Sequence, residues 1–301
     1  MTPGRRTVNA YWEIVMTNEV ENVRAMRTWE EFQAAIAIFQ TESNTYLYRL
    51  LYRGHADSSW KLHTTLERAH MMRVSMGQYY GLMRRIKPAL ESLTDRSWPM
   101  TYPPEITRVL TEYGAGMDSF GSGETMAYEL MTHLRHHGFP SPLLDWTRSV
   151  YVASFFAFAG ARPISACDAN KPERRVAVNV LAVLKHDPNV YGDEIPRIIP
   201  VGQYLKTHKR HVQQQSEYTM CVCHNGVWRY EPHTTVWNND ASGQRGMLYK
   251  YTIPVSERAK VLSYLDQFNV NAFSLYGSEE SLMETLAFRN GVGDPLSDWD
   301  V

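Results

Sequence analysis

The chain has 301 residues, of which 44% are hydrophobic, and a formal net charge of −1. A net charge so close to zero excludes a global electrostatic field that draws the protein to nucleic acid or to a membrane surface. Cys167, Cys221 and Cys223 are too few for a disulfide framework, which indicates a reducing compartment. No apolar run approaches the roughly 20 residues of a membrane span, and the N-terminus has no apolar segment typical of a signal peptide. We therefore expect a cytoplasmic protein without a membrane partner.

The first half of the chain predicts mainly helices. Residues 27–40 predict a helix in which Thr28 is the N-cap and Glu31 completes a capping box. Residues 44–54 have the alternating pattern of a strand that ends at Gly54. Further along we expect a helix over 78–93 with a break near Pro88, a turn and short helix over 101–110, a glycine-rich loop over 113–123, a helix over 124–137 that stops at Gly138, and a central apolar helix over 149–160.

The second half of the chain predicts mainly strands. Residues 161–175 form a polar connector, and the following apolar run over 175–185 predicts a buried strand. Two further strands are expected over 217–225 and 246–255, and two late helices over 254–268 and 278–289. This order of helices and strands favours an α+β fold with a mixed, bent sheet flanked by helices.

Three blocks of sequence carry a resemblance to a known family. They are "LYRGHADSSWKLHTTLER", "RHHGFPSPLLDWTRSVYVASFFAF" and "KRHVQQQSEYTM", in this order. Together they resemble the FRG domain family of bacterial and phage proteins, which is named for an aromatic-Arg-Gly triplet. The matching residues are Tyr52, Arg53 and Gly54, then Trp60 and Leu62, then His137 with Leu143, Leu144, Asp145, Trp146 and Thr147, and finally Gln214 after Arg210.

The resemblance covers most of the chain, from Tyr48 to Phe288. It divides the sequence into an N-terminal helical extension over 1–45, an FRG-like domain over 46–290 and a C-terminal tail over 291–301. The sequence departs from the family pattern at Ser216, where a glycine is usual, and at His137, which Gly138 follows one residue too early.

The resemblance implies a relation to ADP-ribosyltransferases, which cleave NAD and pass ADP-ribose to an acceptor, and therefore an ADP-ribosyltransferase-like fold. Such an enzyme needs a basic group at the end of its first strand, a Ser/Thr segment nearby and a late carboxylate. Here Arg53, Thr147 or Ser149, and Gln215-Ser216-Glu217 can supply these parts. A guanidinium binds diphosphate oxygens in bidentate fashion, and a carboxylate stabilises the oxocarbenium-like ribose from which nicotinamide leaves.

The resemblance therefore implies a set of site residues that we expect to line a common cleft. The predicted catalytic residues are Arg53, Glu217 and Gln214. The predicted residues that contact NAD are Arg53, Asp145, Trp146, Thr147, His137 and Tyr52. We expect no metal.

Each of these residues also has a purely structural interpretation. Arg53 can be a salt-bridge partner. Asp145 can cap the helix, with a start near Thr147, or it can hold Arg53 in a buried ion pair. We favour a structural role in which Asp145 holds the helix start and positions Arg53. Trp146 can be a core residue, Thr147 an alternative N-cap and His137 a histidine with ordinary hydrogen bonds.

Glu217 can lie on a solvated helix end, because the family's glutamine falls on Gln214 and offsets the Gln-x-Glu match by one residue. Cys221 and Cys223 alternate along a strand beside His224, and they are expected to be packed thiols rather than metal ligands. The basic run from Lys206 to His211 favours a solvated helix face over a phosphate site.

The leading hypothesis is an NAD-dependent ADP-ribosyltransferase or NAD-consuming hydrolase in a toxin or phage-defence system, with a protein or nucleic acid as acceptor. The alternative is a non-enzymatic module that binds nucleic acid or protein. A third interpretation treats the shared blocks as packing motifs of a scaffold, so that changes in them would abolish folding rather than activity.

Overall fold

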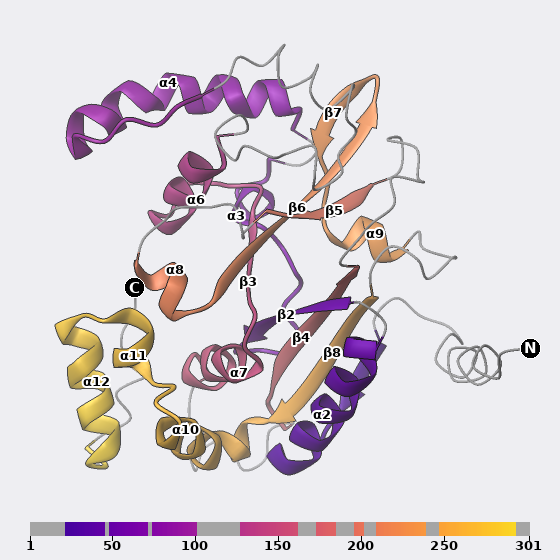
Figure 1. Ribbon diagram of the computed structural model, residues 1–301, viewed down its shortest axis with the longest axis vertical. Helices are drawn as coiled ribbons and strands as arrows, with labels where there is room; N and C mark the ends of the chain where they lie inside the picture. Colours follow the sequence, from indigo (N-terminus) through magenta and orange to yellow (C-terminus); the bar gives the residue numbers. More distant parts are fainter. Residues whose placement is uncertain are drawn as a thin grey trace, which may run out of the picture.

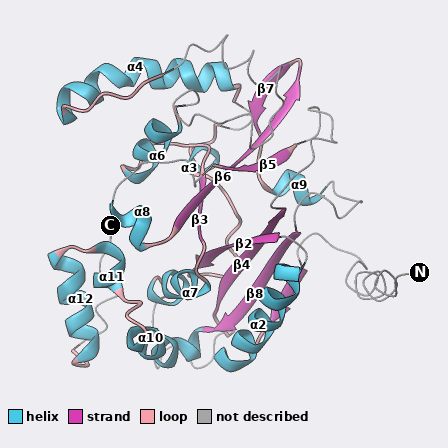
Figure 2. Cartoon of the chain, in the orientation of Figure 1, coloured by secondary structure: helices cyan, strands magenta, loops and turns pink. Residues whose placement is uncertain are grey.

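The computed structural model describes residues 22–45, 48–71, 74–100, 127–161, 173–184, 196–201, 209–238 and 247–292. These residues form an open mixed sheet of eight strands flanked by helices, so the predicted α+β class is confirmed (Figure 2). The elements are β1 (Asn22–Ala25), α2 (Trp29–Thr45), β2 (Tyr48–His55), α3 (Thr65–Arg68), α4 (Met76–Thr94), α6 (Tyr128–His136), β3 (Leu144–Thr147), α7 (Val150–Ala159), β4 (Arg175–Leu184), β5 (Arg197–Pro200), α8 (Lys209–Gln213), β6 (Ser216–Asn225), β7 (Val227–Tyr230), α9 (Thr234–Asn238), β8 (Met247–Pro254), η4 (Val255–Glu257), α10 (Arg258–Gln267), α11 (Ala272–Tyr276) and α12 (Glu279–Arg289).

The sheet has two halves that meet at β3. Its strand order is β1-β8-β4-β2-β3-β6-β5, with β7 paired to the free part of β6. Only β1 and β8 are parallel; the other pairs are antiparallel. Strand β3 pairs with β6 over four residues but with β2 through one pair, Tyr52 and Thr147. Figure 1 shows the consequence: β3 runs between a lower group of β2, β4 and β8 and an upper group of β5, β6 and β7.

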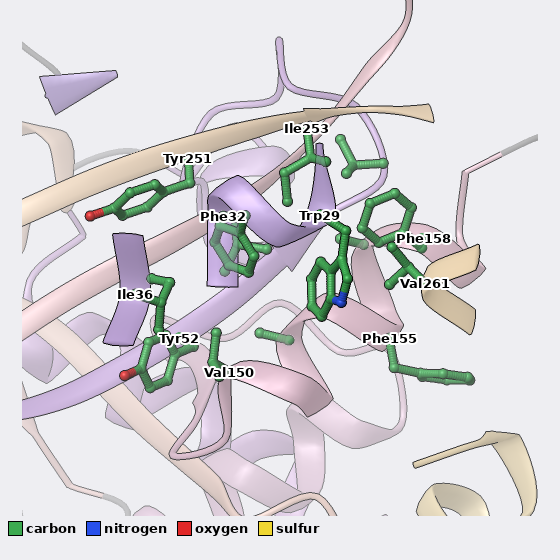
Figure 3. Packing of buried hydrophobic residues seen from close by; sticks show 14 of the residues in the cluster. Trp29, Phe32, Ile36, Tyr52, Val150, Phe155, Phe158, Tyr251, Ile253 and Val261 are labelled. Atoms are coloured by element: carbon green, nitrogen blue, oxygen red, sulfur yellow. The ribbon is translucent and has the colours of Figure 1, made fainter. Parts of the chain in front are cut away.

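One face of the lower half is covered by helices. Alternate residues of β2, β4 and β8, such as Tyr52, Val178 and Tyr251, are buried on this face. They pack against α2, α7 and α10, and Figure 3 shows Trp29 and Phe32 of α2 beside Tyr251 and other members of this cluster. In the upper half a second cluster joins α4 and α6 to buried residues of β6 and β7. Most of the apolar burial that stabilises the fold is thus on one face of the sheet.

The helix α7 lies in backbone contact with β2. An alanine Cβ at Gly54 would lie 1.9 Å from the carbonyl oxygen of Ala153 and 2.7 Å from the amide nitrogen of Ala157. Only a residue without a side chain fits this approach. The glycine that follows Arg53 is therefore required by the helix that follows the Leu-Leu-Asp-Trp-Thr segment.

The N-terminal segment is part of the same core. The sequence predicts residues 1–45 as a helical extension, and the described part, 22–45, contributes β1 to the sheet and α2 to its helical layer. Thr28 acts as predicted, because its hydroxyl accepts a hydrogen bond from the N–H of Glu31 (3.2 Å). The carboxylate of Glu31 instead accepts from the N–H of Arg27 (2.7 Å), so the capping box is displaced by one residue.

Several predicted boundaries are wrong. The helix α4 runs through Pro88 without ending, and it starts at the N-cap Ser75, whose hydroxyl accepts from the N–H of Gln78. The predicted helix start near Thr147 is instead strand β3, and α7 is capped by Ser149, so neither Asp145 nor Thr147 caps it. A strand of four residues is too short to show a periodicity in the sequence. The strand β3 forms because it pairs with β6.

The helix predicted over 27–40 continues to Thr45, so the strand predicted over 44–54 begins only at Tyr48. The remaining predicted elements agree with the structure where it describes them. The strands over 175–185, 217–225 and 246–255 correspond to β4, β6 and β8, and the late helices correspond to α10 and α12. The predicted elements over 101–110 and 113–123 lie outside the described residues. Within the described ranges, no helix is long and apolar enough to cross a membrane.

Candidate functional site

The sheet face opposite the helical layer carries a row of polar side chains across three strands. In the strand register, Arg53 of β2 is opposite Asn179 of β4, which is opposite Lys250 of β8. Residues directly opposite each other in antiparallel strands share a face. The preceding row on this face is apolar, with Leu51, Leu181 and Leu248 in the third buried cluster. Burying a polar group costs free energy unless the group is paired, so buried polar side chains within apolar strands point to a candidate site.

Arg53 occupies the place where β2 and β3 separate. Its Nη1 donates to the carbonyl oxygen of Asp145 and to the Oδ1 atom of the same residue, both at 2.6 Å. Its Nε donates to Nε2 of His55 (3.1 Å). The remaining terminal nitrogen, Nη2, forms no hydrogen bond with a described residue. This ion pair is one of the two structural roles predicted for Asp145; the other, capping the following helix, is wrong, because Ser149 caps α7.

Asp145 also binds a second guanidinium, that of Arg135 at the C-terminal end of α6. Arg135 is held in turn by the hydroxyl of Thr65, which accepts from Nη1 at 3.3 Å. Burial raises the pKa of Asp145, but the charges of Arg135 and Arg53 and the hydrogen bond from Arg53 outweigh it, so the pKa lies far below its usual range. The carboxylate is therefore ionised at all working pH values, and it joins the two halves of the sheet.

Removal of this carboxylate should destabilise the protein. In Asp145→Ala, two guanidinium groups whose side chains are only 15% and 10% exposed would face each other without a counter-charge. A broken buried pair costs about 3–5 kcal/mol. The Asp145 side chain is 45% exposed, and solvent screening reduces this cost. We expect a loss of about 2 kcal/mol in the free energy of unfolding, measured by urea denaturation.

The matched control for this variant is Asp266→Ala. Asp266 accepts two hydrogen bonds from Arg289, whose side chain is well exposed, and one from the side-chain amide of Asn271. Its loss leaves no pair of buried guanidinium groups facing each other, so it should cost only about 1 kcal/mol. Equal stability losses in the two variants would contradict the clamp that we describe for Asp145.

Two buried histidines flank the Arg53–Asp145 pair in their neutral form. Burial, together with the charges of Arg53 and Lys250, lowers the pKa of His55 to about 3. Burial likewise lowers the pKa of His233 to about 3, with contributions from Arg53 and Arg135. Because Arg53 Nε can only donate, His55 Nε2 is the acceptor and its proton is on Nδ1. His55 can therefore orient Arg53 but cannot exchange a proton near neutral pH.

Cations outnumber carboxylates around this site. The charges of Arg53, Arg135 and Asp145 all act on the pKa of Arg68, which burial lowers. The pKa of Asp57, in the turn after β2, is lowered mainly by its hydrogen bonds with Ser59. The positive charges of Arg174 and Lys250 also lower it. A site with this balance favours an anionic ligand over a cation or a metal.

Glu217 is buried in β6 rather than solvated at a helix end. It is opposite Trp146 in the register, and its side chain is only 2% exposed. Its Oε1 lies 3.5 Å from Nη1 of Arg49 and 4.0 Å from Nε of Arg148, while Oε2 forms no hydrogen bond with the described residues. Burial raises the pKa of Glu217, and the charges of Arg49 and Arg148 offset this only in part. A buried carboxylate with a free oxygen is costly, and such groups are enriched at functional sites.

The other predicted site residues are distributed around the sheet. Gln214 turns its side chain to α11, where Nε2 donates to the carbonyl oxygen of Leu275 (3.2 Å). Thr147 donates to the carbonyl oxygen of Gln214 (2.7 Å) and so connects β3 to the start of β6. Tyr52 lies in the helix-covered core, on the face opposite Arg53, and its hydroxyl accepts from Gln40.

Two aromatic residues from the predicted set also have structural contacts. Trp146 is buried beside the polar row, and its indole N–H donates to the hydroxyl of Thr219 (2.9 Å), which also bonds His233. His137 is exposed at the C-terminal end of α6, where its ring lies 4.3 Å from that of His133. From the same helix it is Arg135, not His137, that reaches Asp145.

The cysteines and the basic run noted in the sequence do not contribute to this site. Cys221 and Cys223 are buried thiols without a disulfide, and burial raises the pKa of Cys221. The described residues contain no cluster of potential metal ligands. In the basic run, Lys206 to His208 lie outside the described residues, and Arg210 donates to the carbonyl oxygen of Tyr276.

Some of the site residues that were absent from the predicted set have a recognisable signal in the sequence. His55 is two residues after Arg53 and therefore on the same face of β2. Asn179 and Lys250 are polar residues inside the apolar strands predicted over 175–185 and 246–255. Arg135 and His233 have no such signal, because only the tertiary packing of α6 and of the loop before α9 places them beside Asp145 and Arg53.

Comparison with known proteins supports part of the resemblance. The family model of the FRG domain matches residues 48–165. This span contains Arg53, Gly54 and Asp145, but it ends before Gln214 and Glu217, although the resemblance was expected to continue to Phe288. Neither a curated protein nor a solved structure matches the chain.

Proposed function

We propose that the protein binds NAD across the polar face of the sheet and releases nicotinamide, as an ADP-ribosyltransferase or an NAD-consuming hydrolase. The toxin or phage-defence setting belongs to the same proposal, because it follows from the FRG resemblance. The non-enzymatic module remains the competing hypothesis.

The adjacency of three strands carries this proposal. The chemistry needs a basic group at a strand end, a Ser/Thr segment and a late carboxylate. Arg53 is near the end of β2, Thr147 ends the neighbouring β3, and Glu217 is the second residue of β6, the next strand in the sheet. Three segments that are far apart in sequence are thus consecutive neighbours in space. Glu217 is moreover on the same face as Arg53, as the register shows.

The electrostatics agree with a dinucleotide phosphate at Arg53. Nη2 of Arg53 is available, His55 holds the guanidinium plane by accepting from Nε, and Lys250 adds a further positive charge on this face. Guanidinium groups that are fixed in place bind phosphate oxygens with little loss of side-chain entropy.

Glu217 would act at the other end of the ligand. Its free Oε2 can accept a hydrogen bond from a ribose hydroxyl, and its negative charge would stabilise the positive charge that develops as nicotinamide leaves. The carbon–nitrogen bond electrons leave with nicotinamide, and water or an acceptor nucleophile supplies the electron pair of the new bond. Burial of Glu217 strengthens this interaction, because few solvent molecules screen it.

The test is release of nicotinamide from NAD by the purified chain, measured by chromatography with and without cell extract as a source of acceptors. We expect release in at least one condition. Arg53→Lys should weaken NAD binding, because the single ammonium nitrogen of lysine cannot reach His55, Asp145 and a phosphate, for which the guanidinium has separate nitrogens. If no condition yields nicotinamide, the non-enzymatic module replaces the present proposal.

A further inference from the structure

We infer that Trp60 is the stacking surface for the adenine ring of NAD, so that the adenine end of the ligand lies beyond His55, next to the proposed phosphate site at Arg53. This inference rests on the proposed function for the identity of the ligand. The position of Trp60 itself rests on separate observations.

Trp60 differs in its exposure from the other tryptophans whose burial the structure describes. The side chains of Trp29, Trp98, Trp146 and Trp228 are at most 4% exposed, whereas Trp60 is 55% exposed. An exposed indole leaves a large apolar surface in water, which aromatic stacking with a base would cover. Among the tryptophans whose burial the structure describes, Trp60 is thus the exposed one, and it lies in the turn that directly follows the polar row.

The turn that carries Trp60 is well fixed. The N–H of Trp60 donates to the carbonyl oxygen of Asp57 (3.2 Å), and the Asp57 carboxylate accepts from the N–H of Ser59 (2.8 Å). The N–H of Ser58 donates to the carbonyl oxygen of Arg175 in β4 (2.9 Å), which ties the turn to the sheet. A platform that is ordered before binding loses little conformational entropy when the ligand arrives.

The Trp60 ring is one side chain away from the proposed phosphate site. Its centroid is 6.0 Å from that of the His55 ring, and His55 Nε2 accepts from Nε of Arg53. The imidazole of His55 therefore lies between the indole and the guanidinium. In a nucleotide the ribose likewise lies between the base and the phosphate, so the two groups are spaced to bind both ends of one nucleotide. Lys250 and Arg174 act on Asp57 in the same turn, so cations lie on this side as well.

The order of groups along β2 assigns the adenine to one end of the strand. Arg53 and His55 lie at the end that leads into the turn of Trp60, whereas Arg49 contacts Glu217 near the other end. Arg49 is six positions before His55, about 20 Å along the strand. The buried side chain of Leu51 lies between Arg49 and Arg53 on the same face, so the adenine and the phosphate are assigned together to the Arg53 end.

Ligand fragments test this arrangement. Binding of NAD, ADP, nicotinamide mononucleotide and inorganic pyrophosphate is measured by calorimetry for the wild type, Trp60→Ala and Trp60→Phe. Trp60→Ala should weaken NAD and ADP by about tenfold or more and leave nicotinamide mononucleotide and pyrophosphate unchanged, because base stacking contributes this much. Trp60→Phe should retain most of the affinity.

The control is Phe268→Ala, which removes another exposed aromatic ring, at the end of α10 and stacked on Tyr151. It should change no affinity. The inference is overturned if Trp60→Ala leaves ADP binding intact, if it weakens nicotinamide mononucleotide as much as ADP, or if the wild type binds none of the four ligands. NAD binding with the expected fragment pattern but without nicotinamide release would refute the proposed function and support the adenine site.

Discussion

Gly54→Ala is expected to lower the free energy of unfolding by about 3 kcal/mol or more, because a Cβ at this position would overlap the backbone of α7. The contact at 1.9 Å is with a carbonyl oxygen in the middle of the helix, so no side-chain rotation can relieve it. Either α7 must move away from β2 or β2 must bend. The measurement is thermal and urea unfolding, with the yield of soluble protein as a second readout.

Gly81→Ala is the matched control. Gly81 lies within α4, and an alanine Cβ there would meet no atom within 4 Å. This change should stabilise the protein by about 0.5–1 kcal/mol, because alanine has the higher helix propensity and fewer unfolded conformations. A Gly54→Ala protein that unfolds at the wild-type temperature would show that α7 is not held as close to β2 as we describe.

Glu217→Gln has the largest expected effect on activity. The amide keeps the size of the side chain but removes the charge that would stabilise the oxocarbenium-like ribose. Loss of one strong electrostatic contact commonly lowers kcat by about a hundredfold to a thousandfold. Nicotinamide release is the measurement, and Gln214→Ala and Gln215→Ala are the comparisons. Full activity in Glu217→Gln together with inactivity in Gln214→Ala would remove Glu217 from the proposed mechanism.

The same variant should not be less stable than the wild type at neutral pH. A pKa that is raised in the folded state means that folding favours the protonated carboxyl, and this contribution is lost as the pH rises through the folded pKa. The ionised carboxylate therefore costs free energy near pH 7, and glutamine removes that cost. The stability advantage of Glu217→Gln should shrink as the pH falls through the raised pKa of the folded state, and it should be gone below the usual glutamate pKa. A loss of activity without a loss of stability separates this role from that of Gly54.

The sequence predicts the fold class and the long elements well, because β4, β6, β8 and α12 have clear apolar patterns. The family resemblance singles out Arg53 and Asp145, and their ion pair is one of the structural roles that the residue types themselves suggest. The four-residue strand β3 and the clamp by Arg135 depend on packing between segments that are distant in sequence, which periodicity cannot detect. Burial of Glu217 was missed for the same reason, because a "QQQSE" run looks solvated until β6 is placed between β3 and β5.

The Asp145 carboxylate serves as an internal counterion for Arg53, so an anionic ligand has to compete with it for the guanidinium. A phosphate that reaches Arg53 takes over part of an existing ion pair instead of meeting a hydrated cation, so the process is an exchange of one anion for another. Much of the electrostatic attraction is already satisfied before the ligand arrives. Affinity at this site would consequently depend less on ionic strength than the number of nearby arginines suggests, and selectivity would come from ligand shape rather than from charge.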